Sequence, residues 1–517
     1  MSFIYHDLEN KIKKLNRIGV ALSSQTDLRI LLEMILKEAR EFTNSDAGSL
    51  YRKEGDKLIF EVAQNDTLDR RLSDKKREAF IPFPLPLTKT SIAGYVALTG
   101  IALNIPDVYK LEGEEYSFNC EYDVRNNYKT TSMLVIPMKD HEGEIIGVLQ
   151  LINAIDENGN IISYSKELQE LISSLASQAA VAIRNAKLIE DIKNLFESLV
   201  KYSATAIDAR SPHTAGHSRR VSELSVRVAK AINEEVDGPL SDVKFSPVEI
   251  EELRIAGWLH DIGKIGVREW VLEKANKLNA DRMEAIGNRF QLIGEKMKSE
   301  SLKKKMEVLE KYHQSSAICH QISVIDEELN TAQKELDDEI EFLKRVNEPG
   351  FLKDEELERL KKIAGKKFLN SNGNEEPCLT EFEFVNLSVR KGNLTDEEYK
   401  IIQSHVVHTY NILKNIPFTK NLRNVPLIAA THHEMLNGGG YPHGLKDGQI
   451  PIQARIIGMV DVFDALTAAD RPYKAAIPLD KALQILQFEA QDNRLDKRLV
   501  DLFIGKRLYE ETPKQND

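Results

Sequence analysis

Cysteine is scarce in this sequence, and the few cysteines lie far apart. There are three in 517 residues, Cys120, Cys319 and Cys378, and no two of them form a CxxC pair. This spacing argues against a disulfide framework and against a zinc site with thiolate ligands. We therefore expect a protein of a reducing compartment.

Long apolar runs and an excess of positive charge are also missing. No uninterrupted apolar run approaches the ~18 residues of a membrane span, and the N-terminus mixes charges without an apolar signal core. Acidic residues outnumber basic ones, 81 to 70, and the formal net charge is −11. This balance argues against binding DNA through a broad basic surface. We expect a soluble cytoplasmic protein that binds neither a membrane nor DNA.

The N-terminal part of the chain has the patterns of a mixed domain. Residues 1–24 predict a short helix, and 27–42 have helical apolar spacing. Strand-like segments flank turn signals twice, 47–51 with 57–62 and 132–138 with 145–153, and each pair predicts a β-hairpin. The pattern predicts an α+β domain over about 25–165.

The next segment, 166–210, contains neither glycine nor proline and predicts one long helix. Apolar residues recur there at alternating spacings of four and three, and after a shift by one residue the spacing resumes, which indicates a stutter. The first stripe comprises Leu168, Ile172, Leu175, Ala179, Ala182, Ala186 and Ile189, and the second comprises Ile192, Leu195, Leu199, Tyr202 and Ala206. A helix packed on its own domain and a dimeric coiled coil both fit. Its place between two domains favours the coiled coil, so we predict a homodimer.

The remainder, 211–517, has helical patterns almost throughout and predicts an all-α domain. A charge-rich stretch over about 280–391 contains two of the three cysteines and is typical of an inserted helical hairpin with a connector. A partner-binding role and an inert spacer are both open for this insertion. The expected fold is multidomain: an α+β domain, a connecting helix and an all-α domain with a helical insertion.

Histidine and aspartate gather at a few points of the all-α region. His213 and His217 are four residues apart, so one helix face would carry both. His260 and Asp261 form a doublet at the end of an apolar helix. Burying a carboxylate without a cation is costly, and a metal ion removes that cost. Asp261 could then bridge two ions.

Two of the predicted helices open with capping boxes. Ser246 and Glu249 begin the helix that ends at the doublet, and Thr395 and Glu398 begin a helix that carries His405. Apolar neighbours make His405 a candidate for a half-buried ligand. Alone, such a histidine is more often hydrogen-bonded than metallated.

Two further helices complete the candidate set. One, starting near residue 426, carries His432 and His433, and the last, over 454–468, carries Asp461 beside Asp464. All these donors are imidazole or carboxylate groups, which favours iron, manganese or another transition ion over structural zinc. More than four ligands imply two or three ions, which can clamp a phosphate and generate hydroxide at neutral pH.

Several short sequence motifs then follow one another in a fixed order along the chain. The chain reads HDIGKIG over 260–266, His405 follows, and it then reads HHE over 432–434, GGGYPHGL over 438–445, DVFDALT over 461–467 and DRPYK over 470–474. This set, over about 200–280 and 390–500, resembles the HD-GYP family of cyclic di-GMP phosphodiesterases. The resemblance implies hydrolysis of the cyclic dinucleotide to linear pGpG, and further to GMP, at a centre of two or three iron or manganese ions.

The resemblance also assigns roles to residues. It implies the metal ligands His217, His260, Asp261, His405, His432, His433 and Asp461, with Asp261 bridging two ions. His213 stands where trinuclear members have glutamate, so it is a candidate ligand of a third ion. Lys264 would contact the scissile phosphate beside Asp261, Arg471 and Lys474 would hold phosphate oxygens, and Gly440, Tyr441 and Pro442 would shape the substrate side. Residues 435–437 read MLN where an arginine and an aspartate are commoner, which leaves cyclic di-GMP or another cyclic dinucleotide open.

The segment 126–153 resembles a GAF domain, which implies a regulatory module for the phosphodiesterase. A cyclic nucleotide, another small-molecule ligand and a dimerisation role are all open for it. Two other functions remain for the whole chain. One is a receptor that binds the cyclic dinucleotide, or a signalling partner, without cutting it, and the other is a general HD phosphohydrolase of nucleotides. The retained ligand set argues against the first, and the GYP segment with paired histidines argues against the second.

Overall fold

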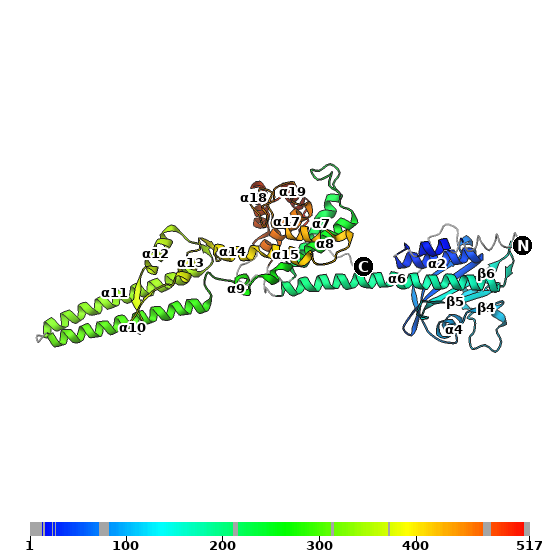
Figure 1. Cartoon of the computed structure of the whole chain (residues 1–517), viewed down its shortest axis with the longest axis horizontal. Helices are drawn as coiled ribbons and strands as arrows, with labels where there is room; N and C mark the ends of the chain where they lie inside the picture. Colours follow the sequence, from blue (N-terminus) through cyan, green and yellow to red (C-terminus); the bar gives the residue numbers. More distant parts are fainter. Residues whose placement is uncertain are drawn as a thin grey trace. The chain divides into compact units, whose positions relative to one another are not determined.

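The computed structural model describes residues 13, 16–22, 24, 25, 27–71, 82–209, 216–311, 315–370, 373–468 and 477–510. The chain divides into two compact units, residues 1–197 and 198–517 (Figure 1). Of the helix expected over 1–24, residues 16–22 are helical, and most of the rest lies outside the described residues. Within the described ranges, no helix has the length and apolar character needed to cross a bilayer.

The first unit is built on one antiparallel sheet. Its strands are β1 (Ser45–Glu54), β2 (Lys57–Asn65), β3 (Phe83–Pro86), β4 (Leu103–Ile105), β5 (Met133–Lys139), β6 (Ile145–Ile155) and β7 (Ile161–Ile162). Their order is β3-β2-β1-β6-β5-β4, and β7 pairs with β6. Both predicted hairpins, β1–β2 and β5–β6, are confirmed by the antiparallel pairings.

Each face of this sheet carries its own apolar core. Helix α2 (Leu28–Thr43) and the start of α6 (Lys166–Asp208) pack on one face, and α4 (Ile92–Thr99) packs on the other (Figure 1). Alternation along β5 explains this division, since Leu134 and Ile136 join the first core, whereas Met133 and Val135 join the second. The shorter helices of the unit are α3 (Asp66–Arg71), η1 (Val108–Lys110) and α5 (Glu121–Asn126).

Helix α6 carries the two apolar stripes in different surroundings. Five members of the first stripe are buried in the core of the first unit: Ile172, Leu175, Ala179, Ala182 and Ala186. Four members of the second stripe are exposed: Ile192, Leu195, Leu199 and Tyr202. The stripes are therefore not one seam with a stutter. The first is explained by packing on its own domain, and periodicity alone could not separate these surroundings.

The second unit is helical. Its main body contains α7 (His217–Asn233), α8 (Pro247–Leu259), η2 (Ile262–Gly266), α9 (Glu269–Leu272), α14 (Asp396–Gln403), α15 (His405–Leu413), η3 (Lys420–Leu422), α16 (Val425–Ala430), α17 (Ile452–Thr467), α18 (Leu479–Gln491) and α19 (Lys497–Gly505). Helix α7 packs against α8 and α17, while α15 packs against η2 and α16. These contacts bring together helix ends that are far apart in sequence.

The inserted segment has a core of its own. Two long helices, α10 (Ala280–Lys311) and α11 (Ser315–Asn347), form the expected hairpin (Figure 1). They are followed by α12 (Asp354–Ala364), α13 (Glu381–Leu387) and two short antiparallel ladders, β8 (Gly350–Phe351) with β11 (Lys391–Gly392) and β9 (Lys367–Leu369) with β10 (Glu375–Pro377). Ile286, Phe290, Leu343, Leu360 and Leu387 are among the buried residues of this core.

A buried ion pair of the main body, Lys274 with Glu398, also holds the insertion through a hydrogen bond to Asn386. The Nζ of Lys274 donates to the Glu398 carboxylate at 2.7 and 2.8 Å and to Asn386 Oδ1 of α13 at 2.7 Å. The side chains of Lys274 and Glu398 are only 9% and 7% exposed. Breaking a buried pair leaves one charge uncompensated, which costs more than the pair itself contributes.

Lys274→Met is therefore expected to destabilise the second unit by about 3–5 kcal/mol. Calorimetric unfolding should show a lower midpoint for this variant. Lys298→Met is the matched control, because its pair with Glu295 is exposed and such pairs contribute about 0–1 kcal/mol. Equal midpoints for the two variants would contradict the assignment.

Candidate metal centre

Three histidines present the same ring nitrogen in the same way. Each lies at a helix end or in a turn, and its Nδ1 meets the carbonyl oxygen three residues earlier: His260 with Gly257 at 2.8 Å, His405 with Ile402 at 2.6 Å and His432 with Ala429 at 2.6 Å. A carbonyl only accepts, so Nδ1 carries the proton in each ring. The Nε2 atom of each ring is consequently the one left to face a cation.

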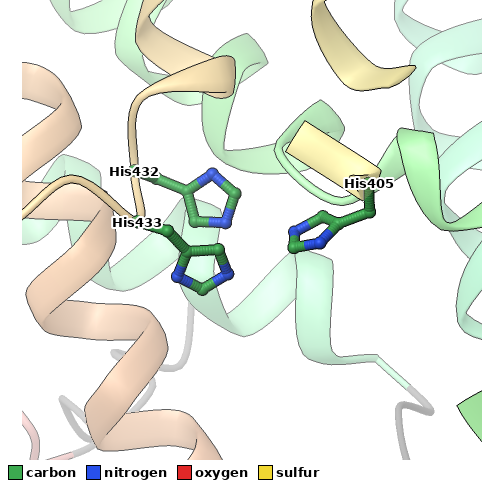
Figure 2. Close-up of side chains that lie close together, drawn as sticks. All are labelled: His405, His432 and His433. Atoms are coloured by element: carbon green, nitrogen blue, oxygen red, sulfur yellow. The ribbon is translucent and has the colours of Figure 1, made fainter. Parts of the chain in front are cut away.

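These Nε2 atoms lie in the interior of the second unit. Among the described residues, the Nε2 atoms of His405 and His432 are buried without a hydrogen-bond partner. The Nε2 atoms of His217 and His260 lie 3.3 Å apart. Figure 2 shows His405 facing His432 and His433. The Nε2 atoms of His405 and His432, which have no hydrogen-bond donor opposite them, fit a metal site, because unpaired buried polar atoms are otherwise costly.

The donors form three overlapping groups in which all ligand atoms lie within 4.8 Å of one another. The groups are His405 with His432 and His433, His217 with His260 and Asp461, and His260 with Asp261 and His432. The third group shares a histidine with each of the other two. This arrangement suits two or more neighbouring ions rather than one.

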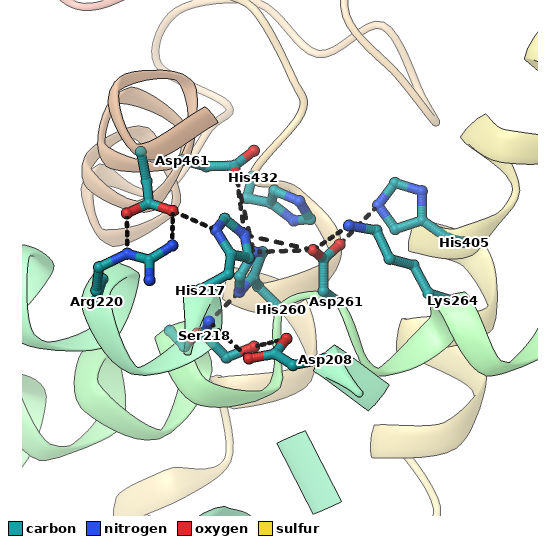
Figure 3. Close-up of polar contacts among 12 residues, drawn as sticks. Asp208, His217, Ser218, Arg220, His260, Asp261, Lys264, His405, His432 and Asp461 are labelled. Atoms are coloured by element: carbon teal, nitrogen blue, oxygen red, sulfur yellow. Dashed lines mark hydrogen bonds and ion pairs between the residues drawn. The ribbon is translucent and has the colours of Figure 1, made fainter. Parts of the chain in front are cut away.

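Asp261 places one carboxylate oxygen toward each side of the centre (Figure 3). Its Oδ1 is 3.3 Å from His405 Nε2, and its Oδ2 is 3.4 Å from His260 Nε2. Asp461 Oδ1 lies 3.2 Å from His217 Nε2. A carboxylate placed between two imidazole groups in this way has the geometry to bridge two cations.

Burial and nearby charges together keep most of these groups in the forms that bind metal ions. Burial lowers the pKa of His405 and of His432, and it lowers the pKa of His433 to about 4, so these rings are neutral at pH 7. Burial alone raises the pKa of Asp461, but its neighbouring histidines outweigh burial and hold that pKa below its ordinary value. Lys264 and the nearby histidines do the same for the pKa of Asp261.

His217 behaves differently from the other rings. Burial lowers its pKa, but hydrogen bonds to Asp261, Asp461 and Asp464 outweigh burial and raise the pKa to about 11. A proton on Nε2 competes with a metal ion for the same lone pair, and ion binding must release it.

Metal affinity is therefore expected to rise with pH, by up to about tenfold per unit for each proton released, because the His217 pKa of about 11 lies above the working range. Chelator competition with Mn²⁺ between about pH 6.5 and about pH 8.5 measures this slope. An affinity independent of pH would contradict the assignment of His217 as a ligand.

Two residues that support His217 were not assigned a role from the sequence. His217 Nδ1 lies 2.7 Å from Asp464 Oδ2, and Arg220 Nε donates to Asp464 Oδ1 at 2.6 Å. The pair fixes the ring orientation and directs Nε2 toward the centre. A signal was present, since Arg220 follows His217 and Asp464 follows Asp461 by three residues, on the same helix faces.

The last residue of α6, Asp208, was also missed. Its buried carboxylate accepts hydrogen bonds from the backbone N–H of Ser218 at 3.2 Å and from Ser218 Oγ at 2.9 Å. Ser218 is the chain neighbour of His217, so the end of α6 holds the backbone beside a candidate ligand (Figure 3). This contact joins residues of two different helices, and no short-range pattern could have revealed it.

Close backbone packing holds the segment of His260 and Asp261 against α15. Thr409 Oγ1 donates to the His260 carbonyl and accepts the N–H of Gly263, both at 3.0 Å. A Cβ at Gly263 would lie 1.9 Å from the carbonyl oxygen of His405. Only glycine therefore allows η2 to approach the start of α15 this closely.

The loop over 438–445, which contains the Gly-Tyr-Pro sequence and is called the GYP loop here, is held by Glu434. Its carboxylate accepts the backbone N–H groups of His443 at 2.7 Å and Leu445 at 2.8 Å. The Tyr441 N–H donates to the His433 carbonyl at 3.2 Å, and the two rings lie 4.8 Å apart between centroids. The loop therefore positions Tyr441 beside the histidines.

The structure brings eight predicted site residues together: His217, His260, Asp261, Lys264, His405, His432, His433 and Asp461. Gly440, Tyr441 and Pro442 form the adjoining loop. His213, Arg471 and Lys474 lie outside the described residues.

Two local predictions were wrong. His405 begins its own helix, α15, after α14 ends at Gln403, whereas one helix was expected. Helix α16 ends at Ala430, so His432 and His433 lie in the turn that follows, not on a helix. Leaving the helix frees the adjacent rings from the ~100° offset of consecutive helical residues, and their centroids come within 4.0 Å.

Comparison with known families defines the two parts of the chain. Residues 27–183 match the GAF domain, and residues 214–363 and 382–499 match HD domain families. The chain thus has an N-terminal GAF domain followed by an HD domain, which is the organisation expected of an HD-GYP protein with a GAF domain.

Individual relatives match over limited segments. The chain is 42% identical over 98 residues to the 3'3'-cGAMP-specific phosphodiesterase 3 of Vibrio cholerae, covering 19% of this chain and 20% of that protein. It is 33% identical over 182 residues to the dual 3',5'-cyclic-AMP and -GMP phosphodiesterase 11 of Drosophila melanogaster, covering 33% of this chain and 11% of that protein. The chain thus spans a fifth or less of the length of these relatives. The GAF domain of an Acinetobacter phosphoenolpyruvate-protein phosphotransferase is 16% identical, with a TM-score of 0.27, over 35% of this chain and 97% of that one.

Proposed function

We propose that the chain is a metal-dependent phosphodiesterase of HD-GYP type that hydrolyses a cyclic dinucleotide. The observation that carries the proposal is the ring of inward Nε2 atoms around Asp261, whose two oxygens face different histidines. Cyclic di-GMP is the first candidate substrate, with linear pGpG and then GMP as products. The name of the Vibrio relative makes 3'3'-cGAMP the second candidate.

The donor set fits iron or manganese, since it combines neutral imidazoles with carboxylates and contains no thiolate. Such ions, when bound, polarise phosphoryl oxygens and lower the pKa of water. His217, His260, Asp261, His405, His432, His433 and Asp461 are the residues that would hold them, and Arg220 with Asp464 would orient His217.

Lys264 supplies positive charge at the edge of the centre. Its Nζ donates to Asp261 Oδ2, and its side chain is 24% exposed. We propose that the same ammonium contacts a phosphate bound at the centre. We assign to it the neutralisation of charge that develops on the phosphoryl oxygens. Tyr441 and the adjoining loop would limit which bases fit beside that phosphate.

A substrate panel tests the proposal against its alternatives. Anaerobically purified protein would be analysed for metal and assayed with cyclic di-GMP, 3'3'-cGAMP, cyclic di-AMP and a nucleoside triphosphate. Cleavage of a cyclic dinucleotide without cleavage of the nucleoside triphosphate supports the proposal. Binding without cleavage by metal-loaded protein would indicate a receptor, and preference for the triphosphate would indicate a general phosphohydrolase.

We further propose that the GAF domain regulates this activity through α6. The first stripe of α6 is buried in the GAF core, and the helix ends at Asp208, which holds Ser218 beside His217. Deleting residues 1–165 should therefore change the turnover rate, and an unchanged rate and oligomeric state would refute this coupling.

Asp208→Ala is expected to weaken metal binding or turnover by about 10–100-fold, as for other residues that orient a ligand from behind. Chelator competition and product analysis measure the two effects. Asp191→Ala, at an exposed position of the same helix, is the matched control and should leave both unchanged. If the two variants had the same metal affinity and turnover, Asp208 would have no part in the proposed coupling.

A further inference from the structure

The GYP loop has a second support besides Glu434, namely the turn that joins α18 to α19. This turn, residues 492–496, is called the C-terminal turn here. The N–H of Leu436 donates to the Arg494 carbonyl at 3.3 Å. The chain just before the GYP loop is therefore bonded to a turn far along the sequence, whereas Glu434 holds the loop from within its own segment.

Asn437 strengthens this attachment with its side chain. Its Nδ2 donates to the Asp492 carbonyl at 3.2 Å, and its Oδ1 accepts the N–H of Gly439 at 2.8 Å. An aspartate at this position could accept from Gly439 but could not donate to a carbonyl, because an ionised carboxylate only accepts. Asparagine, which departs from the residue types commoner in this stretch of the family, therefore fits the C-terminal turn.

Arg455 attaches the returning end of the loop segment to the same turn. Its Nε donates to the Ile450 carbonyl at 3.0 Å, and its Nη1 lies 2.8 Å from Asp447 Oδ1 and 3.1 Å from Asp496 Oδ2. The side chains of Arg455 and Asp496 are only 10% and 4% exposed, so dissolved salt screens their pair weakly. Hydrogen bonds between charged groups are also stronger than those between neutral groups.

The two ends of the loop segment pair with each other as well. Asn437 and Lys446 form an antiparallel bridge, and the N–H of Asp447 donates to the Leu436 carbonyl at 3.2 Å. The GYP loop therefore leaves and re-enters one short, hydrogen-bonded base. Because Tyr441 lies between these two ends, a base that is fixed on the C-terminal turn limits how far Tyr441 can move.

We propose that Asn437 and Arg455 are positioning residues for the substrate: they hold the base of the GYP loop on the C-terminal turn and thereby fix the place of Tyr441. This role rests on the proposed function, since that function assigns the loop to the substrate side. Both polar atoms of the Asn437 amide already have partners within the protein. The preference for one cyclic dinucleotide is accordingly set by the shape of the held loop, and a contact between Asn437 and a base is not needed.

Steady-state kinetics of the full chain test this role. The double variant Asn437→Ala with Asp447→Ala removes side-chain bonds at both ends of the loop, and both positions are exposed, so the fold should be kept. We expect KM for the cleaved cyclic dinucleotide to rise by about tenfold while kcat and metal content stay within about twofold, because the loop binds the substrate without acting on the reacting atoms. A KM within about twofold of the native value, or a fall in kcat or metal content alone, would overturn the role.

Asn437→Asp separates positioning from direct contact. It keeps the acceptor for Gly439 and loses the donor for Asp492, so KM should lie between those of the native chain and the double variant. A KM below the native value would show that this side chain meets the substrate, and the proposed role would be wrong. Asp480→Ala with Gln491→Ala is the matched control, because it removes an exposed carboxylate and an exposed amide from α18 and should leave KM unchanged.

Hydrogen exchange of the metal-free protein tests the same role without substrate. Backbone amides of the GYP loop should exchange at least about threefold faster in the double variant than in the native chain, because the loop opens more often once its base is loosened. Equal exchange rates would overturn the role whatever the kinetics show. A native chain that cleaves no cyclic dinucleotide, yet shows faster exchange in the double variant, would refute the proposed function and leave the support of the loop standing.

Discussion

Asp261→Ala is expected to abolish turnover and metal retention together. Asp261 is 5% exposed, and its two oxygens face His405 and His260 at 3.3 and 3.4 Å. In the proposed assignment, the centre without this carboxylate would lack the ligand that lies between His405 and His260 and the anionic charge that would offset the cations. We expect a fall in turnover of roughly 10³-fold or more.

The measurement combines metal analysis with quantified cyclic dinucleotide cleavage on the same preparation. Asp242→Ala is the matched control, because it removes an exposed carboxylate from the same unit and should change neither quantity. Full activity in the Asp261 variant would show that the site is assigned wrongly.

Lys264→Ala is expected to separate catalysis from metal binding. The ammonium contacts Asp261 but is not a metal ligand, so its loss should slow turnover by about 10²–10³-fold while the metal content stays unchanged. Single-turnover kinetics with metal-loaded protein measure the chemical step. Lys230→Ala, at an exposed position of α7, serves as the control.

The metal content of the Lys264→Ala variant decides the role of Lys264. A variant that loses metal would indicate that the ammonium stabilises the centre itself, and the proposed contact with the phosphate would then be unsupported. A variant that keeps both metal and rate would exclude Lys264 from the reaction.

Short-range signals predicted the elements that depend on short-range physics. The capping boxes at Ser246 and Thr395 begin α8 and α14 as expected, because a cap is satisfied within one turn of helix. Both hairpins follow from alternation around a turn signal. The candidate ligands were likewise visible as residue types in an ordered set of motifs.

Long-range features were not predictable in the same way. The two stripes of α6 have the same spacing, yet one is buried in the GAF core and the other is exposed, because periodicity does not identify the partner. The contact of Asp208 with Ser218 joins the end of α6 to the start of α7, which have no shared sequence pattern. By contrast, Arg220 and Asp464 could have been predicted as supporting residues, because each follows a candidate ligand by three residues on the same helix face.

The hydrogen bonds that orient His260, His405 and His432 are all local, since each ring is held by a carbonyl oxygen three residues earlier. Each of these segments therefore fixes the orientation of its own histidine ring, and this orientation does not depend on what lies between the segments in the chain. The long insertion enters and leaves through α9 and α14, which pack against each other. A gene could accordingly gain or lose this whole hairpin while the rings on either side of it kept their directions.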